Sequence, residues 1–142
     1  MKQYSESITI KGDAKIDESA VLDEHVTIDA TEGAVVIEGG AHIEKGTEIL
    51  GAAGATTKIG AYAHIGEHAR IRGSQIGAYA TVKDEVMTGR EVYVGDYSIV
   101  EAKTILNDTA KVPSRAVASG SPFSIVRGLT QEELDEADGR RC

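Results

Sequence analysis

A hydrophobic period of six residues runs through most of this chain of 142 residues. The pentapeptide IGAYA at residues 59–63 recurs unchanged at 76–80, and a looser copy, VGDYS, follows at 94–98. The two offsets are 17 and 18 residues, close to three periods of six. Self-similarity of this kind is typical of solenoid folds, in which each repeat stacks on its neighbours. It predicts an all-β fold, a parallel β-helix of hexapeptide repeats.

The residues expected to point inward are aliphatic and recur with this period over residues 10–117, enough for about six coils. They are Ile10, Ile16, Leu22, Ile28, Ile37, Ile43, Ile49, Ile59, Ile65, Ile71, Ile76, Val82, Val94, Val100, Leu106 and Val112. Small or β-branched residues stand four positions after most of them, as a triangular coil requires at its corners. Side chains at equivalent positions should stack at the strand spacing of about 4.8 Å.

The period slips at residues 28–37, 49–59 and 71–76, where successive aliphatic residues lie nine, ten and five positions apart. The first two slips predict small loops at corners of the coil, at residues 30–34 and 51–56. Both segments are rich in residues that favour turns. Neither is long enough to form a lid.

The charge balance argues against several partners. Asp and Glu outnumber Lys and Arg by 23 to 15, a net charge of −8, whereas nucleic-acid binding needs a basic surface. No run of 18 apolar residues is present, so we expect no membrane span. The first six residues do not resemble a signal peptide, and the one cysteine, Cys142, cannot form a disulfide within the chain. We therefore expect a cytoplasmic protein.

The end of the chain changes character. Thr130 and Glu133 match a capping box, which predicts a short α-helix from there to about Ala137. We divide the chain into a β-helix domain, residues 1–129, and a C-terminal helix and tail, residues 130–142. The helix should pack its leucines against the coil or against a neighbouring subunit.

The segment VPSRAVASGSP at residues 112–122, followed by IVR at 125–127, resembles the coil-ending signature of γ-class carbonic anhydrase-like proteins. Hexapeptide acyltransferases end in a similar way. The spacing over residues 10–130, insertions included, is closer to the carbonic anhydrase pattern. The resemblance implies a left-handed β-helix and a homotrimer, with small-molecule sites in the clefts between subunits.

The chemistry of that family is missing from this chain. The family binds zinc with three histidines, and the matching positions here are Leu50, Glu67 and Arg72. Leucine cannot bind a metal, and arginine carries a permanent positive charge that repels one. Other matched positions also differ from the residues of the family. Asp29 and Thr31 replace an Arg and an Asp, and Glu44 and Lys45 replace a Gln and an Asp. We expect no zinc, no resident cofactor and no carbon dioxide hydration.

The replacements suggest a structural role for this place in the cleft. Leu50 and Arg72 should lie one above the other on adjacent coils, with Glu67 supplied by the next subunit. We predict an intersubunit Arg72–Glu67 ion pair there, which would fix register more than it stabilises. The alternative is that both side chains are solvated charges at an edge.

Histidines supply the remaining candidates for chemistry. His42 and His64 should stack on adjacent coils, where they could share a metal, act as a general base or form no more than a solvated pair. His68 follows the lost ligand position and is a second candidate base. His25 is expected on the surface.

Three tyrosines, Tyr62, Tyr79 and Tyr97, occupy the same position in successive coils. Such a ladder buries apolar area as its rings stack. It can pack at a subunit contact or beneath the C-terminal helix, or it can form an aromatic wall for a ligand. The sequence does not separate these alternatives.

Two functions therefore stay open. The sequence favours a binding or assembly protein with remodelled intersubunit clefts, because the machinery of the family is absent. The alternative is a hexapeptide acyltransferase, or another enzyme, that uses His64 or His68 as base in the cleft between subunits. Arg115 and Arg127 could then meet the phosphates of coenzyme A near residues 119–121.

Overall fold

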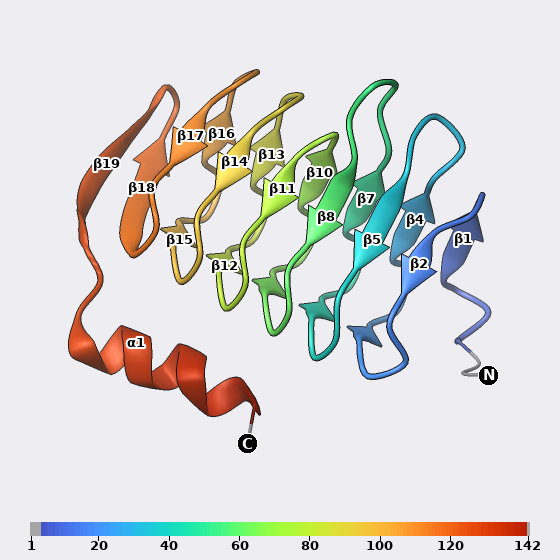
Figure 1. Cartoon of the computed structure of the whole chain (residues 1–142), viewed down its shortest axis with the longest axis horizontal. Coiled ribbons are helices and arrows are strands. Elements are labelled where there is room, and N and C mark those ends of the chain that lie inside the picture. Colours follow the sequence, from blue (N-terminus) through green and yellow to red (C-terminus); the bar gives the residue numbers. More distant parts are fainter. Residues whose placement is uncertain (1–3, 142) are drawn as a thin grey trace.

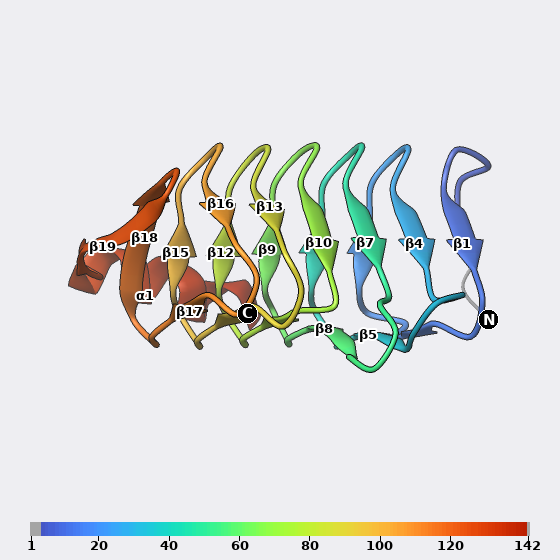
Figure 2. The ribbon, with the colours of Figure 1, turned by 90° about the horizontal axis from the view of Figure 1, so that it is seen from above.

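The computed structural model describes residues 4–141. The chain winds into a left-handed β-helix, and each coil adds one short strand to each of three parallel sheets (Figures 1 and 2). The all-β hexapeptide-repeat fold and the short C-terminal helix expected from the sequence are confirmed. Cys142 lies outside the described residues.

The three sheets run side by side along the solenoid. The first sheet contains β1 (Thr9–Lys11), β4 (Thr27–Asp29), β7 (Glu48–Leu50), β10 (Arg70–Arg72), β13 (Met87–Thr88) and β16 (Ile105–Leu106). The second sheet contains β2 (Lys15–Ile16), β5 (Val35–Ile37), β8 (Thr57–Ile59), β11 (Gln75–Ile76), β14 (Tyr93–Val94) and β17 (Lys111–Val112). The third sheet contains β3 (Val21–Leu22), β6 (His42–Ile43), β9 (His64–Ile65), β12 (Thr81–Val82), β15 (Ile99–Val100), β18 (Ala116–Gly120) and the antiparallel β19 (Phe123–Gly128).

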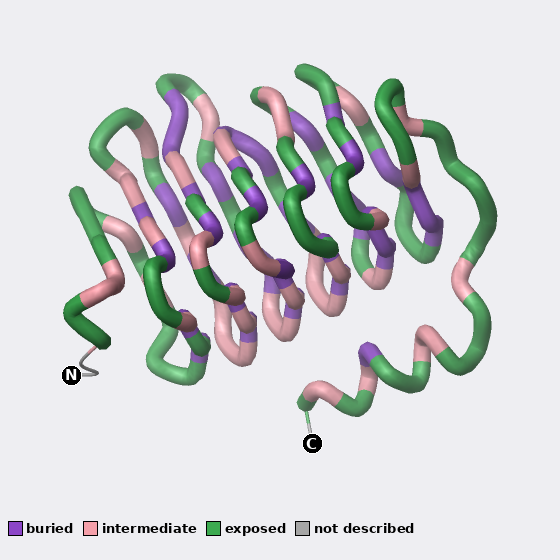
Figure 3. The backbone as a smooth tube through the Cα atoms, turned by 180° about the vertical axis from the view of Figure 1, so that it is seen from behind, coloured by how far each residue is buried: buried purple, intermediate pink, exposed green. Residues whose placement is uncertain are grey.

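The register places equivalent residues of successive coils directly over one another. In the first sheet, Ile28 pairs with Ile49 and Ile49 with Ile71, and all three are fully buried. Buried and exposed residues accordingly alternate along the strands (Figure 3). Ile10, at 38% exposure, and the half-buried Ile16 are the exceptions to the predicted core, because their coil is the first and has a neighbour on one side only.

We call the turns that follow the three sheets the first, second and third corners. The predicted loops at 30–34 and 51–56 both lie at the first corner, between the first and second sheets. They stack closely, since a Cβ added at Gly33 would lie 2.2 Å from the carbonyl oxygen of Ala52. The insertions therefore broaden one corner without disturbing the register of the strands that follow.

The C-terminal helix α1 (Gln131–Asp138) runs back alongside the coils and is followed by a short 3₁₀ turn, Gly139–Arg141 (Figure 1). Its predicted capping box is present: the Thr130 hydroxyl accepts a hydrogen bond from the Glu133 amide, and the Glu133 carboxylate accepts one from the Thr130 amide. Leu129 and Leu134 are half-buried, and Ala137 is the buried residue of the helix. No helix within residues 4–141 is long and apolar enough to cross a membrane.

Shortening a central core side chain should destabilise the fold. We expect Ile71→Ala to lower the free energy of unfolding by about 2–5 kcal/mol, because Ile71 is fully buried between layers and the cavity cannot collapse. The matched control is Ile10→Ala in the open first coil, which should cost much less. Urea unfolding of both variants tests this, and equal losses would contradict the layered core.

Candidate functional site

The residues singled out from the sequence lie in four places on one chain. Asp29, Leu50 and Arg72 lie at the end of first-sheet strands, Glu67 and His68 at the third corner, the tyrosines at the second corner, and His64 on the third sheet. A single chain therefore does not bring all of them together.

The first of these groups forms a column. Asp29 pairs with Leu50 and Leu50 with Arg72 on adjacent strands, and the second of these pairings is the one that the sequence predicts. The Asp29 carboxylate accepts hydrogen bonds from the hydroxyl and amide of Thr31, at 2.6 and 2.9 Å, which lower its pKa. Within the chain, the Arg72 guanidinium lies 3.6 Å from a carboxylate oxygen of Glu32. No metal-binding chemistry follows from this column.

The third corner holds Glu67 and His68. The Glu67 amide donates to the Asp84 carboxylate at 2.8 Å, and His68 is exposed, with its ring over Gly46, where an added Cβ would lie 2.3 Å from Nδ1. Glu67 precedes β10 and Arg72 ends it, so the two side chains lie at opposite edges of the first sheet. Their intersubunit ion pair stays a prediction.

The tyrosine ladder lies at the second corner. The rings of Tyr62 and Tyr79 stack at 5.3 Å, those of Tyr79 and Tyr97 stack at 5.0 Å, and the Arg115 guanidinium lies 5.6 Å from the Tyr97 ring centre. Gly40 begins the same column, and its missing side chain leaves room for the Tyr62 ring. The ladder is thus a continuous aromatic edge.

The C-terminal segment covers this edge. The Tyr97 hydroxyl donates to the Asp138 carboxylate at 2.5 Å, which raises the pKa of Tyr97. The Arg140 guanidinium donates to the carbonyl oxygens of Tyr62, Tyr79 and Ala80 at 3.1–3.4 Å. The ladder therefore packs beneath the C-terminal segment, which is one of the alternatives. Tyr79 and Tyr97 also line a cavity, so the subunit contact and the aromatic wall for a ligand stay predictions.

The third sheet presents two histidines with carboxylate partners. The rings of His42 and His64 stack at 5.0 Å with an angle of 18° between their planes, as their register predicts. His42 Nε2 lies 3.0 Å from an Asp23 carboxylate oxygen, and His64 Nε2 hydrogen bonds to the Glu44 carboxylate. An ionised carboxylate only accepts hydrogen bonds, so Nε2 of His64 carries the hydrogen and Nδ1 of the neutral ring carries the lone pair.

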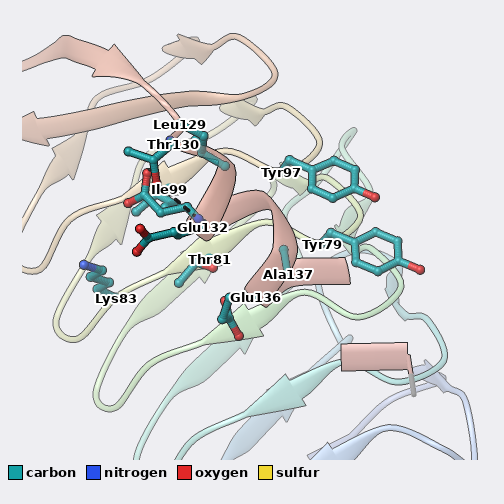
Figure 4. A pocket seen from close by; sticks show the side chains of 11 residues that line it. Tyr79, Thr81, Lys83, Tyr97, Ile99, Leu129, Thr130, Glu132, Glu136 and Ala137 are labelled. Carbon is teal, nitrogen blue, oxygen red and sulfur yellow. Dashed lines mark hydrogen bonds between the residues drawn. The ribbon is translucent and has the colours of Figure 1, made fainter. Parts of the chain in front are cut away.

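Two cavities share lining residues of the third sheet, and His64 lines the smaller one. The smaller, of about 220 Å³, is lined by Glu44, His64, Gly66, Thr81, Val82, Lys83, Asp84 and Ala102. The larger, of about 430 Å³, lies between α1 and the third sheet and shares Thr81 and Lys83 with the first. Figure 4 shows Thr81, Lys83 and Ile99 on the sheet side of the larger cavity, with Glu132 and Glu136 projecting from the helix. The volume of the larger cavity is in the range of small-molecule sites.

The partners of His64 were not found from the sequence. Glu44 was noted only as a lost family residue, and Thr81 and Lys83 were not considered. The sequence does contain a signal for Glu44. His42 lies one coil before His64, and Glu44 follows His42 by two residues, so the side chains of Glu44 and His42 point to the same side of the chain. Lys83 can be recognised only from the structure, since α1 defines the larger cavity that Lys83 lines.

The phosphate contacts suggested for two arginines have competitors in the chain. Arg127 makes a two-point ion pair with Glu133, at 2.7 and 3.0 Å, and Arg115 packs over Tyr97. Within residues 4–141 no group of three or more His, Cys, Asp or Glu side chains is arranged to hold a metal ion.

Comparisons with known proteins give a match in fold. No protein-family model and no curated protein matches the sequence. A hexapeptide transferase family protein from Anaplasma phagocytophilum superposes with a TM-score of 0.74 at 14% identity, covering 96% of this chain and 95% of that one. A provisionally assigned acetyltransferase from Bacillus cereus gives 0.68 at 15% identity, with 96% and 92% covered.

A third similar structure carries a ligand. It is a hexapeptide-repeat acetyltransferase from Vibrio cholerae in complex with acetyl coenzyme A, with a TM-score of 0.53 at 15% identity, covering 85% of this chain and 70% of that one. At these identities the likeness establishes the hexapeptide-repeat fold.

The Arg127–Glu133 pair predicts how acid affects the C-terminal segment. Arg127 lowers the pKa of Glu133 from 4.5 to about 2. A carboxyl with a lowered folded pKa stabilises the fold fully above its unfolded pKa and loses that contribution as the pH falls toward about 2. Glu133→Gln should therefore be less stable than wild type at pH 7 and equally stable near pH 2, measured by thermal melting.

The matched control is Glu132→Gln, one residue earlier, because no ion pair or hydrogen bond to the Glu132 side chain is seen within residues 4–141. A stability difference between wild type and Glu133→Gln that stayed constant from pH 7 to pH 2 would contradict the pairing.

Proposed function

We propose that this protein transfers an acyl group from an acyl-coenzyme A thioester to an amine or hydroxyl acceptor, with His64 as the general base. The observation that carries the proposal is the Glu44–His64 hydrogen bond beside a cavity. A carboxylate that holds an imidazole by one nitrogen leaves the other as an oriented base, the arrangement that acyl transfer needs. The transferase names of the structures that share the fold add support.

The residues divide the reaction between them. His64 Nδ1 takes the proton from the acceptor while the nitrogen or oxygen of the acceptor attacks the thioester carbonyl. The carbon–sulfur bond then breaks, and the thiolate of coenzyme A leaves and takes up a proton, which the imidazolium can return. Within residues 4–141, Lys83 is the one lysine or arginine that lines either cavity. Its ammonium group lies 2.6 Å from a carboxylate oxygen of Glu101. To offset the negative charge that develops on the carbonyl oxygen, Lys83 must leave this ion pair.

This proposal takes up the alternative from the sequence rather than the binding or assembly role that the sequence favoured. It also places the base on the third sheet instead of in the cleft between subunits. His68 is the weaker candidate, because it is exposed and no carboxylate contacts its ring within the described residues.

Acyl transfer is tested with acetyl coenzyme A, a panel of primary amines and release of the free thiol as the readout. We expect His64→Ala to lower kcat by about 10²–10⁴-fold, the usual contribution of a general base, and Glu44→Gln to lower it less. His68→Asn and Glu48→Gln are the matched controls, since Glu48 pairs with Arg70 on the first sheet instead. Activity that survives in His64→Ala but not in His68→Asn would overturn the assignment.

Coenzyme A binding is measured separately by calorimetry. Wild-type protein that gives no heat at millimolar coenzyme A and no thiol release would sink acyl transfer altogether. The binding or assembly role would then be the one to pursue.

The homotrimer and the γ-carbonic anhydrase-like ancestry are also proposals. Asp29, Leu50 and Arg72 lie at one edge of the first sheet and Glu67 at the other. Three chains that packed their first sheets around an axis would bring one edge against the opposite edge of the next chain. The exposed Met87 and Ile105 on that sheet fit such a buried face.

Arg72→Ala tests the predicted intersubunit pair. We expect a homotrimer by light scattering, and we expect the variant to dissociate at higher concentration and to melt at lower temperature than wild type. Lys58→Ala removes a comparable surface ion pair from the second sheet and is the control. Unchanged dissociation and melting of Arg72→Ala would show that no Arg72–Glu67 pair forms.

A further inference from the structure

His42 is a second histidine that the reaction above does not use. It lies directly over His64 in the register of the third sheet. Its Nε2 atom lies 3.0 Å from the Asp23 carboxylate, which comes from the preceding coil. The same relation holds one coil later between Glu44 and His64. The pattern of a carboxylate on one coil and an imidazole on the next is thus repeated along the solenoid.

Strand β6 and the residue that follows it hold His64 in two ways at once. Its outward residue His42 stacks on the His64 ring at 5.0 Å, and Glu44, two residues further along, hydrogen bonds to Nε2 of the same ring. The ring contact sets the plane of the imidazole, and the hydrogen bond sets its rotation within that plane. Both are required before Nδ1 has a defined direction.

The opposite side of the His64 ring is also defined. Thr81 of the next coil is the register partner of His64. Its hydroxyl oxygen accepts a hydrogen bond from Arg140 at 2.6 Å, so Thr81 is fixed by the end of the C-terminal segment. The His64 side chain is 35% exposed, although it lies on an outward face. His42 and Thr81 therefore bracket the ring from the two neighbouring coils.

We propose that His42 is a positioning residue for the His64 base, and that Asp23 positions His42 in turn. His42 covers one face of the His64 ring, excludes water from it and keeps the ring in the plane in which Glu44 can hold Nε2. Without this cover the imidazole can rotate, exchange its hydrogen bond to Glu44 for water and lose the fixed orientation of Nδ1. The expected effect of His42 on turnover rests on the proposed acyl transfer, whereas its effect on the orientation of the His64 ring does not.

The kinetic test compares His42→Ala with His42→Phe. We expect His42→Ala to lower kcat by about tenfold to a hundredfold with little change in KM, because a misdirected base costs turnover and not binding. His42→Phe keeps a ring over His64 and should restore kcat to within about threefold of wild type. Asp23→Ala should give an intermediate loss, and His25→Asn, an exposed histidine, should give none.

Two kinetic results would overturn the proposal. Wild-type kcat in His42→Ala, alongside an inactive His64→Ala, would show that His64 acts without its neighbour. Failure of His42→Phe to restore turnover, in a protein that melts like wild type, would show that His42 acts through its nitrogen atoms and not through its ring.

A second readout does not depend on activity. Nitrogen chemical shifts of the imidazoles at pH 8 report which nitrogen carries the hydrogen. We expect His64 to be in the single Nε2–H form in wild type and His42→Phe, and in a mixture of both tautomers in His42→Ala. An unchanged tautomer in His42→Ala would reject the positioning role even if no acyl acceptor were ever found.

Discussion

The parallel register between coils is the constraint on which the rest of the structure depends. Because each coil hydrogen bonds to the next without a shift, a residue type repeated with the correct offset becomes a column of contacts at about 5 Å. The buried isoleucines of the first sheet form one such column, and the tyrosines of the second corner form another. The histidine pair of the third sheet follows from the same geometry.

The C-terminal segment encloses a cavity against the surface of this solenoid. A strand face is flat, and columns of outward side chains alone enclose little volume. Helix α1 lies against the third sheet, held by Tyr97–Asp138 and by the Arg140 contacts with three carbonyl oxygens. The cavity beneath it shares Thr81 and Lys83 with the smaller cavity, which His64 lines.

Most of the fold could be predicted because the repeat fixes both period and register. The predicted inward residues fill the core except near the open first coil, where Ile10 lacks a layer on one side. The stacking of His42 on His64 and of the tyrosines on one another also follows from the number of residues that separates them in the repeat. The capping box gave the start of α1 at Thr130.

The site was less accessible to sequence reasoning, for a physical reason. Counting tells which residues share a column, but contacts between neighbouring columns depend on side-chain direction. Glu44 reaches His64 from the neighbouring outward column, and in the sequence it stands out only as a replaced family residue. Where α1 would lie was likewise open, since Leu129 and Leu134 could have met the coil or another subunit.

The most direct test of a site on the third sheet is a titration of the protein with coenzyme A. The imidazole proton resonances of the four histidines are the observable. His42 and His64 lie on the third sheet, whereas His25 and His68 lie at the third corner. We expect saturating coenzyme A to shift the resonances of His64 and His42 and to leave those of His25 and His68 in place. Shifts confined to His68, or no shift at millimolar ligand, would contradict a site on the third sheet.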